Sequence, residues 1–173
     1  MRAVVHCGLP KTGTTTLQVS LWQARRELRR HGVCYPDGRV RPLHTHKAIT
    51  PLFMDGSRIS PHVLYDGYRR RSDDEVRGEA QRVWTGIVRE VRRARPELVV
   101  LSAETYASLR TVEEAERLRD LLADIADDDR ISLYVRNPAE RYLSSVRQRA
   151  KARGEFFAPA GASLRPFLES VEQ

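Results

Sequence analysis

Short, mainly apolar runs alternate with amphipathic stretches along this chain, and that alternation restricts the folds open to it. Residues 2–7, 98–101 and 131–135 are predicted to be buried strands, because parallel strands covered on both faces are apolar almost throughout. Segments with helical spacing of apolar residues lie between them. This order favours an α/β fold, a three-layer sandwich with a mainly parallel sheet. The length of 173 residues predicts a single domain over residues 1–173.

The segments between the strands carry recognisable helix starts and stops. A helix should run from about Thr14 to a stop at Gly32, and Ser72–Glu75 and Thr111–Glu114 are capping boxes that open two more. Pro138 suits the first turn of a fourth helix. Apolar spacing predicts the buried face of each helix: Leu17, Leu21, Ala24 and Leu28; Val76, Ala80, Val83, Ile87, Val91 and Ala94; Val112, Ala115, Leu118, Leu122 and Ile125; Tyr142 and Val146.

Three further segments are assigned from turn-forming residues or from a lack of periodicity. Val33–Tyr35 is predicted to form a short strand before the Pro36–Gly38 turn, and Asp127–Asp129 is predicted to be a solvated turn. Residues 37–71 show no clear periodicity. Loops of this length in compact domains are usually functional or disordered, and we expect this one to shape the pocket for a substrate.

The positive charge of the chain favours an anionic partner, although a solvated, arginine-rich surface is the more common explanation of such a composition. The formal net charge is +7, which suits a phosphorylated cofactor, an acidic glycan or nucleic acid. Clusters such as Arg69–Arg71 lack the interleaved aromatic residues on which bases stack, so we expect no nucleic-acid partner. No apolar run reaches the ~18 residues of a membrane span, and residues 1–7 are too short for a signal peptide. We therefore expect a cytoplasmic protein with no membrane partner.

The cysteine and histidine residues indicate neither a disulfide framework nor a metal centre. Cys7 and Cys34 lack the spacing of redox or metal-binding pairs, and Cys7 should be a buried apolar residue. His44 and His46 could clamp a metal ion together, but no third ligand lies nearby. The prediction is therefore a chain without a metal site.

The segment Gly8–Thr16 has the context of a phosphate-binding loop. It lies between a predicted buried strand and a predicted amphipathic helix. Gly13 lets the backbone turn tightly and approach an anion. The amides of Gly13, Thr14 and Thr15 would open the helix and point at the ligand, while Lys11 adds a mobile positive charge. An ordinary strand–helix turn is the alternative reading of this segment.

The same segment is not a Walker A loop. Gly8 and Gly13 have the Walker spacing, but Thr14-Thr15 stands where a lysine followed by serine or threonine is required. Lys11 lies two residues before the second glycine instead. An ATP-using P-loop kinase therefore stays an alternative that lacks its usual lysine and an obvious Walker B aspartate. A non-catalytic basic module that binds anions is a second alternative.

Two motifs resemble the cofactor-binding motifs of the PAPS-dependent sulfotransferases, where PAPS is 3'-phosphoadenosine 5'-phosphosulfate. The run from Pro10 to Thr15 is similar to the family's 5'-phosphosulfate loop, commonly Pro-Lys-x-Gly-Thr-Thr. Arg136-Asn137-Pro138, with Ser144 eight residues after the arginine, looks like its 3'-phosphate motif. The resemblance implies a P-loop NTPase-like fold and PAPS as the cofactor, which these residues would bind: Pro10, Lys11, Thr12, Gly13, Thr14, Thr15, Arg136 and Ser144.

The resemblance also implies a reaction and catalytic residues. In the family, a catalytic residue often follows the strand between the two motifs, and here Glu104 occupies that point. Glu104 would act as the base and Lys11 would neutralise charge on the transferred group, while His46, with His44, is the competing base. The expected activity is transfer of a sulfuryl group to a hydroxyl or amine acceptor, such as a glycan or small molecule. A helix-capping or ion-pairing role is the other reading of Glu104.

The chain departs from the family pattern after its second motif. Family members are usually longer and carry a further cofactor segment with glycine and lysine there, and nothing like it occurs between Lys151 and Gln173. We expect either an incomplete N-terminal portion of such a domain or a site completed by other means. The sequence identifies neither the acceptor nor the oligomeric state.

Overall fold

A computed structural model describes residues 1–9, 12–38, 44–54, 72–140, 142–144 and 146. The chain divides into two compact units, residues 1–136 and 137–173. Pro10, Lys11 and the larger part of the expected pocket loop lie outside the described residues. The prediction of one domain over the whole chain stays a prediction.

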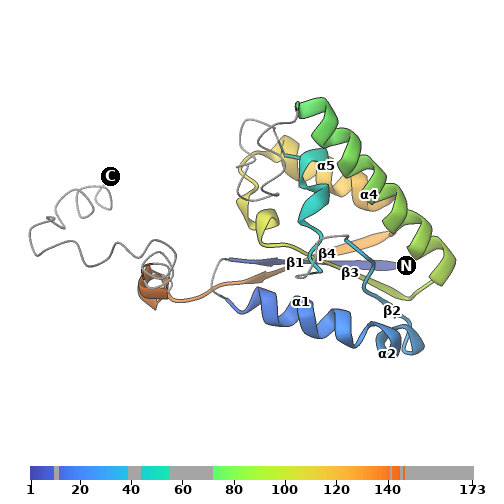
Figure 1. Cartoon of the computed structure of the whole chain (residues 1–173), viewed down its shortest axis with the longest axis horizontal. Coiled ribbons are helices and arrows are strands. Elements are labelled where there is room, and N and C mark those ends of the chain that lie inside the picture. Colours follow the sequence, from blue (N-terminus) through green and yellow to red (C-terminus); the bar gives the residue numbers. More distant parts are fainter. Residues whose placement is uncertain (10–11, 39–43, 55–71, 141, 145, 147–173) are drawn as a thin grey trace, which may run out of the picture. The chain divides into compact units, whose positions relative to one another are not determined.

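The first unit is built on a four-stranded, all-parallel sheet with the order β2-β3-β1-β4 (Figure 1). The central strand β1 pairs with β3 on one side and with β4 on the other. The three predicted main strands and the predicted short strand are therefore confirmed. Their bounds are Arg2–Gly8 for β1, Val33–Cys34 for β2, Leu98–Ser102 for β3 and Asp128–Tyr134 for β4.

Helices cover both faces of this sheet, which confirms the three-layer α/β sandwich. Figure 1 shows α1 (Thr14–Gln23) and α2 (Arg25–Arg30) on one face, with α4 (Asp73–Ala94) and α5 (Val112–Ala123) on the other. Two short 3₁₀ helices, η1 (Lys47–Leu52) and η4 (Glu104–Ser108), pack against each other through the Phe53 and Tyr106 rings. Within the described residues, no helix is long and apolar enough to cross a membrane.

Side-chain caps fix where the two long helices begin. The Ser72 hydroxyl accepts from the Glu75 amide at 3.3 Å, and the Glu75 carboxylate accepts from the Ser72 amide at 2.8 Å, so this capping box is complete. Thr111 accepts from the Glu114 amide at 3.2 Å. The Glu114 carboxylate, however, accepts from the Arg110 amide at 2.9 Å, one residue before the capping position, so the second box is only half formed.

The inner face of α4 follows the prediction more closely than that of α5. Ala80, Val83, Ile87 and Val91 are buried, together with Trp84, whereas Ala94 at the helix end is exposed. On α5, Val112 is 69% exposed and Ala115 is exposed, so their predicted burial is wrong. Glu114 turns inward to bond the preceding loop, so the buried stripe of α5 starts there and continues through Leu118 and Leu122.

The first helix differs most from its prediction. It ends at Gln23, and a second helix starts at Arg25, although neither glycine nor proline marks the break. The predicted leucine face is only half-buried, and Ala24 is exposed. Thr14 and Gln18 are the buried residues of α1, because this side of the helix meets polar groups at the strand ends rather than apolar side chains.

The edge strand β4 starts earlier and is more exposed than predicted. Asp128 and Asp129, expected in a turn, pair with Arg2 and Ala3 of β1. Carboxylates can extend an edge strand because their side chains reach solvent. In the described part of the chain, Ile131 is 56% exposed and Leu133, Tyr134 and Val135 are exposed too, so the predicted burial of this strand is wrong.

Candidate functional site

The connections of the sheet mark one end of it as the place for a ligand. After β1 the chain enters α1 on one face, and after β3 it enters η4 and α5 on the other (Figure 1). In open α/β sheets, ligands bind at the carboxyl ends of strands where neighbouring connections leave to opposite faces. The carboxyl ends of β1 and β3 are therefore the candidate site.

Strand register brings the predicted site segments to the same level of this edge. His6 pairs with Ser102, and the Ala103 amide donates to the His6 carbonyl at 3.2 Å. Counting two residues onward places Glu104 level with Gly8, which pairs with Tyr134 of β4. The loop after β1, the residues after β3 and the start of the segment after β4 consequently meet at one edge.

The loop after β1 is shaped by hydrogen bonds to Leu9. The Thr12 hydroxyl and amide both donate to the Leu9 carbonyl, at 2.6 and 3.2 Å, and the Leu9 amide donates to the Tyr134 carbonyl at 3.1 Å. Gly13 then adopts a left-handed conformation, with φ 83°, immediately before α1. Glycine enters this region without the steric cost of a Cβ atom, so the predicted tight turn at Gly13 is observed.

The loop also requires a glycine at position 8. The Thr14 side chain is buried against it, and a Cβ atom built on Gly8 would lie 2.2 Å from the Thr14 hydroxyl oxygen. Thr12 and Thr14 hydroxyl oxygens lie 3.2 Å apart. The end of β1 and the first turn of α1 thus pack together without room for another side chain.

Gly8→Ala should lower the free energy of unfolding by about 1–3 kcal/mol, the usual cost of overpacking. Because the clash is with the Thr14 hydroxyl, adding Thr14→Ala to the same chain should restore part of that loss. Chemical denaturation of the parent, both single variants and the double variant measures the coupling. Equal stability of the parent and Gly8→Ala would contradict this close packing.

The amino end of α1 differs from those of the two long helices on the opposite face, α4 and α5. Ser72 and Thr111 cap α4 and α5, and both helices have acidic residues in their first turn. Helix α1 has no side-chain cap and no acidic residue in its first turn. No described residue accepts from the amides of its first residues, Thr14–Thr16. The donors and the positive end of the helix dipole suit an anion.

An open cavity of about 530 Å³ joins this helix start to the end of β4. Thr12 and Gly13 line it from the loop, and Leu133–Arg136 line it from the strand and the residues that follow. The structure therefore brings Arg136 of the second predicted motif to the same cavity as part of the first. Ser144 is half-buried in a helical segment of the second unit. In the same unit, the Asn137 carboxamide accepts a hydrogen bond from the Ala139 amide at 2.9 Å.

Ser102, the last residue of β3, connects the segments around the candidate site. Its carbonyl accepts from the His46 amide at 2.9 Å and from the Thr45 hydroxyl at 3.0 Å. Its hydroxyl lies 3.1 Å from the Gln18 amide nitrogen of α1 and 2.8 Å from His6 Nδ1. One strand end thus holds the start of η1, the helix α1 and the strand β1 in a fixed arrangement.

The surroundings of His46 give it a structural role. The ring is fully buried. Nδ1 accepts from the Ser102 amide at 3.0 Å, so Nε2 carries the proton and donates to the Pro36 carbonyl at 2.9 Å. Burial lowers its pKa to about 4. Because both ring nitrogens are already hydrogen-bonded, His46 has no atom free to accept a proton from a substrate or to bind a metal ion, so the predicted role of His46 as a base is wrong.

Lys47 is a site residue that the sequence analysis did not single out. It follows directly after Thr45 and His46, which are bonded to Ser102, and Glu104 stands two residues after Ser102. Burial lowers the pKa of Lys47, and the nearby Glu104 carboxylate partly opposes that shift. The structure thus brings a half-buried ammonium to a half-buried carboxylate, a pairing that no local sequence pattern indicates.

His6 is a second residue that the sequence analysis missed. It is 3% exposed, its Nε2 has no hydrogen-bond partner among the described residues, and burial lowers its pKa. Its ring stands edge-on to Tyr134, with centroids 4.6 Å apart. A histidine inside an apolar strand was the signal available, because such a side chain needs polar partners when it is buried.

Comparison with known proteins does not assign the chain to a family. It matches no protein-family model, and no curated protein is significantly similar to it. The resemblance to sulfotransferases therefore rests on two short motifs and their order in the chain.

Proposed function

We propose that this protein is a PAPS-dependent sulfotransferase that transfers a sulfuryl group to a hydroxyl or amine acceptor. One observation carries the proposal. Thr12 and Gly13, at an uncapped helix start, line the same open cavity as Arg136, which comes from a distant part of the chain. A ligand with two separated anionic groups would use both ends of such a cavity.

The two ends of the cavity suit the two anionic ends of PAPS. The loop amides, the threonine hydroxyls and Lys11 would bind the 5'-phosphosulfate, and the Arg136 guanidinium with the Ser144 hydroxyl would bind the 3'-phosphate. The roles of Pro10, Lys11 and Ser144 in this proposal come from the sequence motifs. A P-loop-like course of the loop from Gly8 to Thr15 is part of the same proposal.

The reaction would be an in-line displacement at sulfur. Glu104 accepts the proton of the acceptor, whose oxygen or nitrogen forms a bond to sulfur while the bond from sulfur to the 5'-phosphate oxygen breaks. The products are the sulfated acceptor and 3',5'-adenosine bisphosphate. Lys11 and the loop amides stabilise the negative charge that grows on the leaving phosphate. The Lys47 ammonium favours the ionised form of Glu104 that this step requires.

The location and acceptor are part of the proposal. Cys7 and Cys34 are both free and buried, and burial raises the pKa of each thiol to about 11. Unpaired thiols accord with a reducing compartment, so we place the activity in the cytoplasm. The acceptor would be a glycan or a small molecule, and η1 lies close to the proposed base, because the Thr50 hydroxyl is 2.8 Å from the hydroxyl of Thr105, the residue after Glu104.

The chain should bind 3',5'-adenosine bisphosphate about ten- to a hundredfold more tightly than 5'-AMP. Only the bisphosphate reaches both anion sites, and a charge-assisted contact contributes ~1.5–3 kcal/mol. Isothermal titration with the two nucleotides measures the preference, and Arg136→Ala should remove it. Arg130→Ala, on the neighbouring strand β4, is the matched control and should leave the preference intact.

Three results would contradict the proposal in different ways. Equal affinity for 3',5'-adenosine bisphosphate and 5'-AMP would contradict the proposed 3'-phosphate site. Tighter binding of ATP than of the bisphosphate would favour a kinase. Tight binding of PAPS without transfer to any acceptor in a broad panel would indicate that the protein is a non-catalytic anion-binding module.

A further inference from the structure

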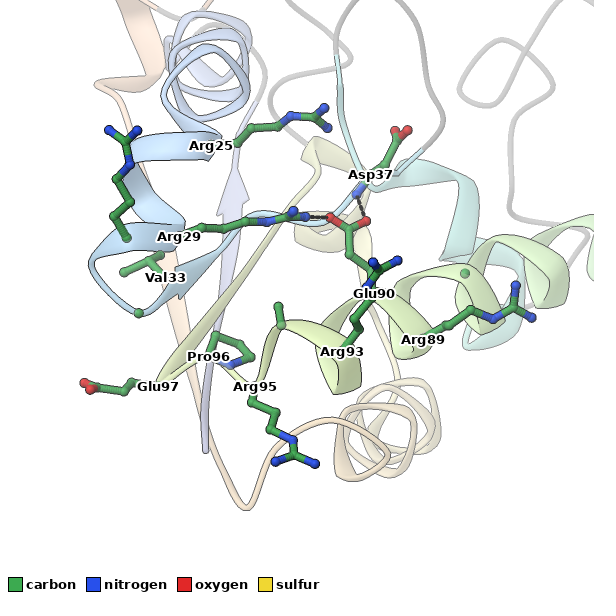
Figure 2. Close-up of a pocket in the computed structure, with 14 residues that line it drawn as sticks. Arg25, Arg29, Val33, Asp37, Arg89, Glu90, Arg93, Arg95, Pro96 and Glu97 are labelled. Atoms are coloured by element: carbon green, nitrogen blue, oxygen red, sulfur yellow. Dashed lines mark hydrogen bonds and ion pairs between the residues drawn. The ribbon is translucent and has the colours of Figure 1, made fainter.

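A second cavity, of about 1000 Å³, lies at the β2 edge of the sheet (Figure 2). Helix α2 and the C-terminal part of α4 supply its walls, and the residues that enter β2 and β3 line it between them. These are the amino ends of the strands. The candidate site lies at their carboxyl ends, so the cavity is a separate feature of the fold.

Arginine dominates the lining of this cavity, which we call the arginine cleft. Six arginines and three acidic residues line it, so the cleft carries an excess of positive charge. Its described lining contains neither lysine nor an aromatic side chain. The arginines are Arg25, Arg29, Arg30, Arg89, Arg93 and Arg95, and the acids are Asp37, Glu90 and Glu97.

Glu90 organises the base of the arginine cleft. One of its carboxylate oxygens pairs with Arg29 of α2, and the other accepts from the Asp37 amide at 3.0 Å (Figure 2). The carboxylate is thus satisfied by α2 and by the turn after β2. The three elements are tied together, and Glu90 is not left to neutralise the other arginines.

Most of the remaining arginines keep their charge available. Arg25 lies over the Trp22 ring at 3.8 Å from its centroid. Arg89, Arg93 and Arg95 are exposed, and none of them forms an ion pair with a described residue. Favourable interaction with the helix dipole accounts for a cation in the last turn, such as Arg93. It does not account for Arg89 or Arg25, which lie outside the last turns of their helices.

Arg95 adds an independent observation. It ends α4 in a left-handed conformation, with φ 45° and ψ 54°. Glycine or asparagine usually occupies that position, because a Cβ atom makes the left-handed conformation sterically unfavourable. An arginine held in a strained conformation at a cationic cavity indicates a use for its side chain, because such strain concentrates at ligand sites.

We propose that the arginine cleft binds a segment of an acidic glycan through its sulfate or carboxylate groups. The planar guanidinium matches these groups with two parallel hydrogen bonds. A glycan is favoured over single-stranded nucleic acid, because the lining offers no aromatic ring on which a base could stack. It is favoured over a DNA duplex because the arginines gather in one compact cavity rather than along a track of phosphates.

The test compares two variants that change the net charge equally. The cleft variant carries Arg89→Glu, Arg93→Glu and Arg95→Glu. The control carries Arg77→Glu, Arg82→Glu and Arg92→Glu, which are exposed residues of the same helix outside the cleft. Binding of a size-defined sulfated octasaccharide and of a DNA duplex is measured at two salt concentrations. Thermal unfolding of each variant checks folding, and an Arg→Gln version of the cleft variant replaces it if the charge reversal unfolds α4.

The cleft variant should lose at least about tenfold in affinity for the octasaccharide, because charge-assisted contacts are replaced by repulsion. The control should lose less than about threefold, since distant surface charges are screened. Equal losses in both variants, or no binding by the parent, would overturn the proposal. Tighter binding of the duplex than of the octasaccharide would overturn the choice of a glycan. None of these results depends on sulfotransferase activity.

Discussion

Glu104→Gln should lower the turnover number for sulfuryl transfer by about 10²–10⁴-fold, the usual contribution of a general base. Glutamine keeps the shape of the side chain but cannot take the acceptor proton. Affinity for 3',5'-adenosine bisphosphate should stay within about twofold of the parent, because the proposed phosphate contacts come from the loop after β1 and from Arg136. Single-turnover transfer and nucleotide titration on the same preparation separate the two quantities.

Glu116→Gln on the exposed face of α5 is the matched control. A base also sets the pH dependence of the rate, so the parent should lose activity at acid pH. If Glu104→Gln weakens nucleotide binding as much as turnover, Glu104 positions the loop and is not the base. Unchanged turnover would remove it from the mechanism altogether.

The folded protein should lose about 3 kcal/mol of stability between pH 6.5 and pH 4 through His46 alone. The pKa of this buried imidazole is about 4 in the folded chain, against 6.5 for a histidine in water. The unfolded chain therefore binds the proton first as pH falls. The contribution of His46 is fully present above pH 6.5 and is lost towards pH 4, at about 1.4 kcal/mol per pH unit. Burial of His6 lowers its pKa also and acts in the same direction.

Urea unfolding of the parent and of His46→Asn at several pH values between 7 and 4 measures the pH-dependent contribution of His46 to stability. Asparagine keeps an acceptor for the Ser102 amide, so the variant should fold, with lower stability at pH 7 and a flatter pH profile. His31→Asn, at an exposed histidine, should leave the profile unchanged. A parent profile that is flat over this range, or as steep in His46→Asn, would show that His46 is not the source of this pH dependence.

Local signals in the sequence predicted the elements of the fold, and tertiary contacts decided the rest. The capping box at Ser72 and the helical spacing of apolar residues in α4 are both local to one helix, and both predictions were confirmed. The break after Gln23 has no local signal. The inward turn of Glu114 depends on the Arg110 amide, which a helical pattern does not reveal. The exposure of Ile131 depends on where β4 lies in the sheet.

In the candidate site, too, local sequence predicted some features and tertiary contacts determined the others. The turn at Gly13 and the strand before it follow from short-range chemistry, so the loop could be located in advance. The pairing of Lys47 with Glu104 arises only because His46 is bonded to the end of β3. A histidine in a loop is usually exposed, and His46 differs because Pro36 and Ser102 satisfy both of its nitrogens. Neither partner is a neighbour in the sequence.

The position of Ser102 has a consequence for how such a chain can diversify. Ser102 bonds three segments of the backbone framework, whereas Glu104 stands just beyond the ladder, at the start of η4. An exchange at Glu104 can alter reactivity while the scaffold keeps its shape. An exchange at Ser102 would loosen α1, β1 and the start of η1 together. Under the proposed function, single substitutions after β3 could therefore alter the reaction, provided that the serine before them is retained.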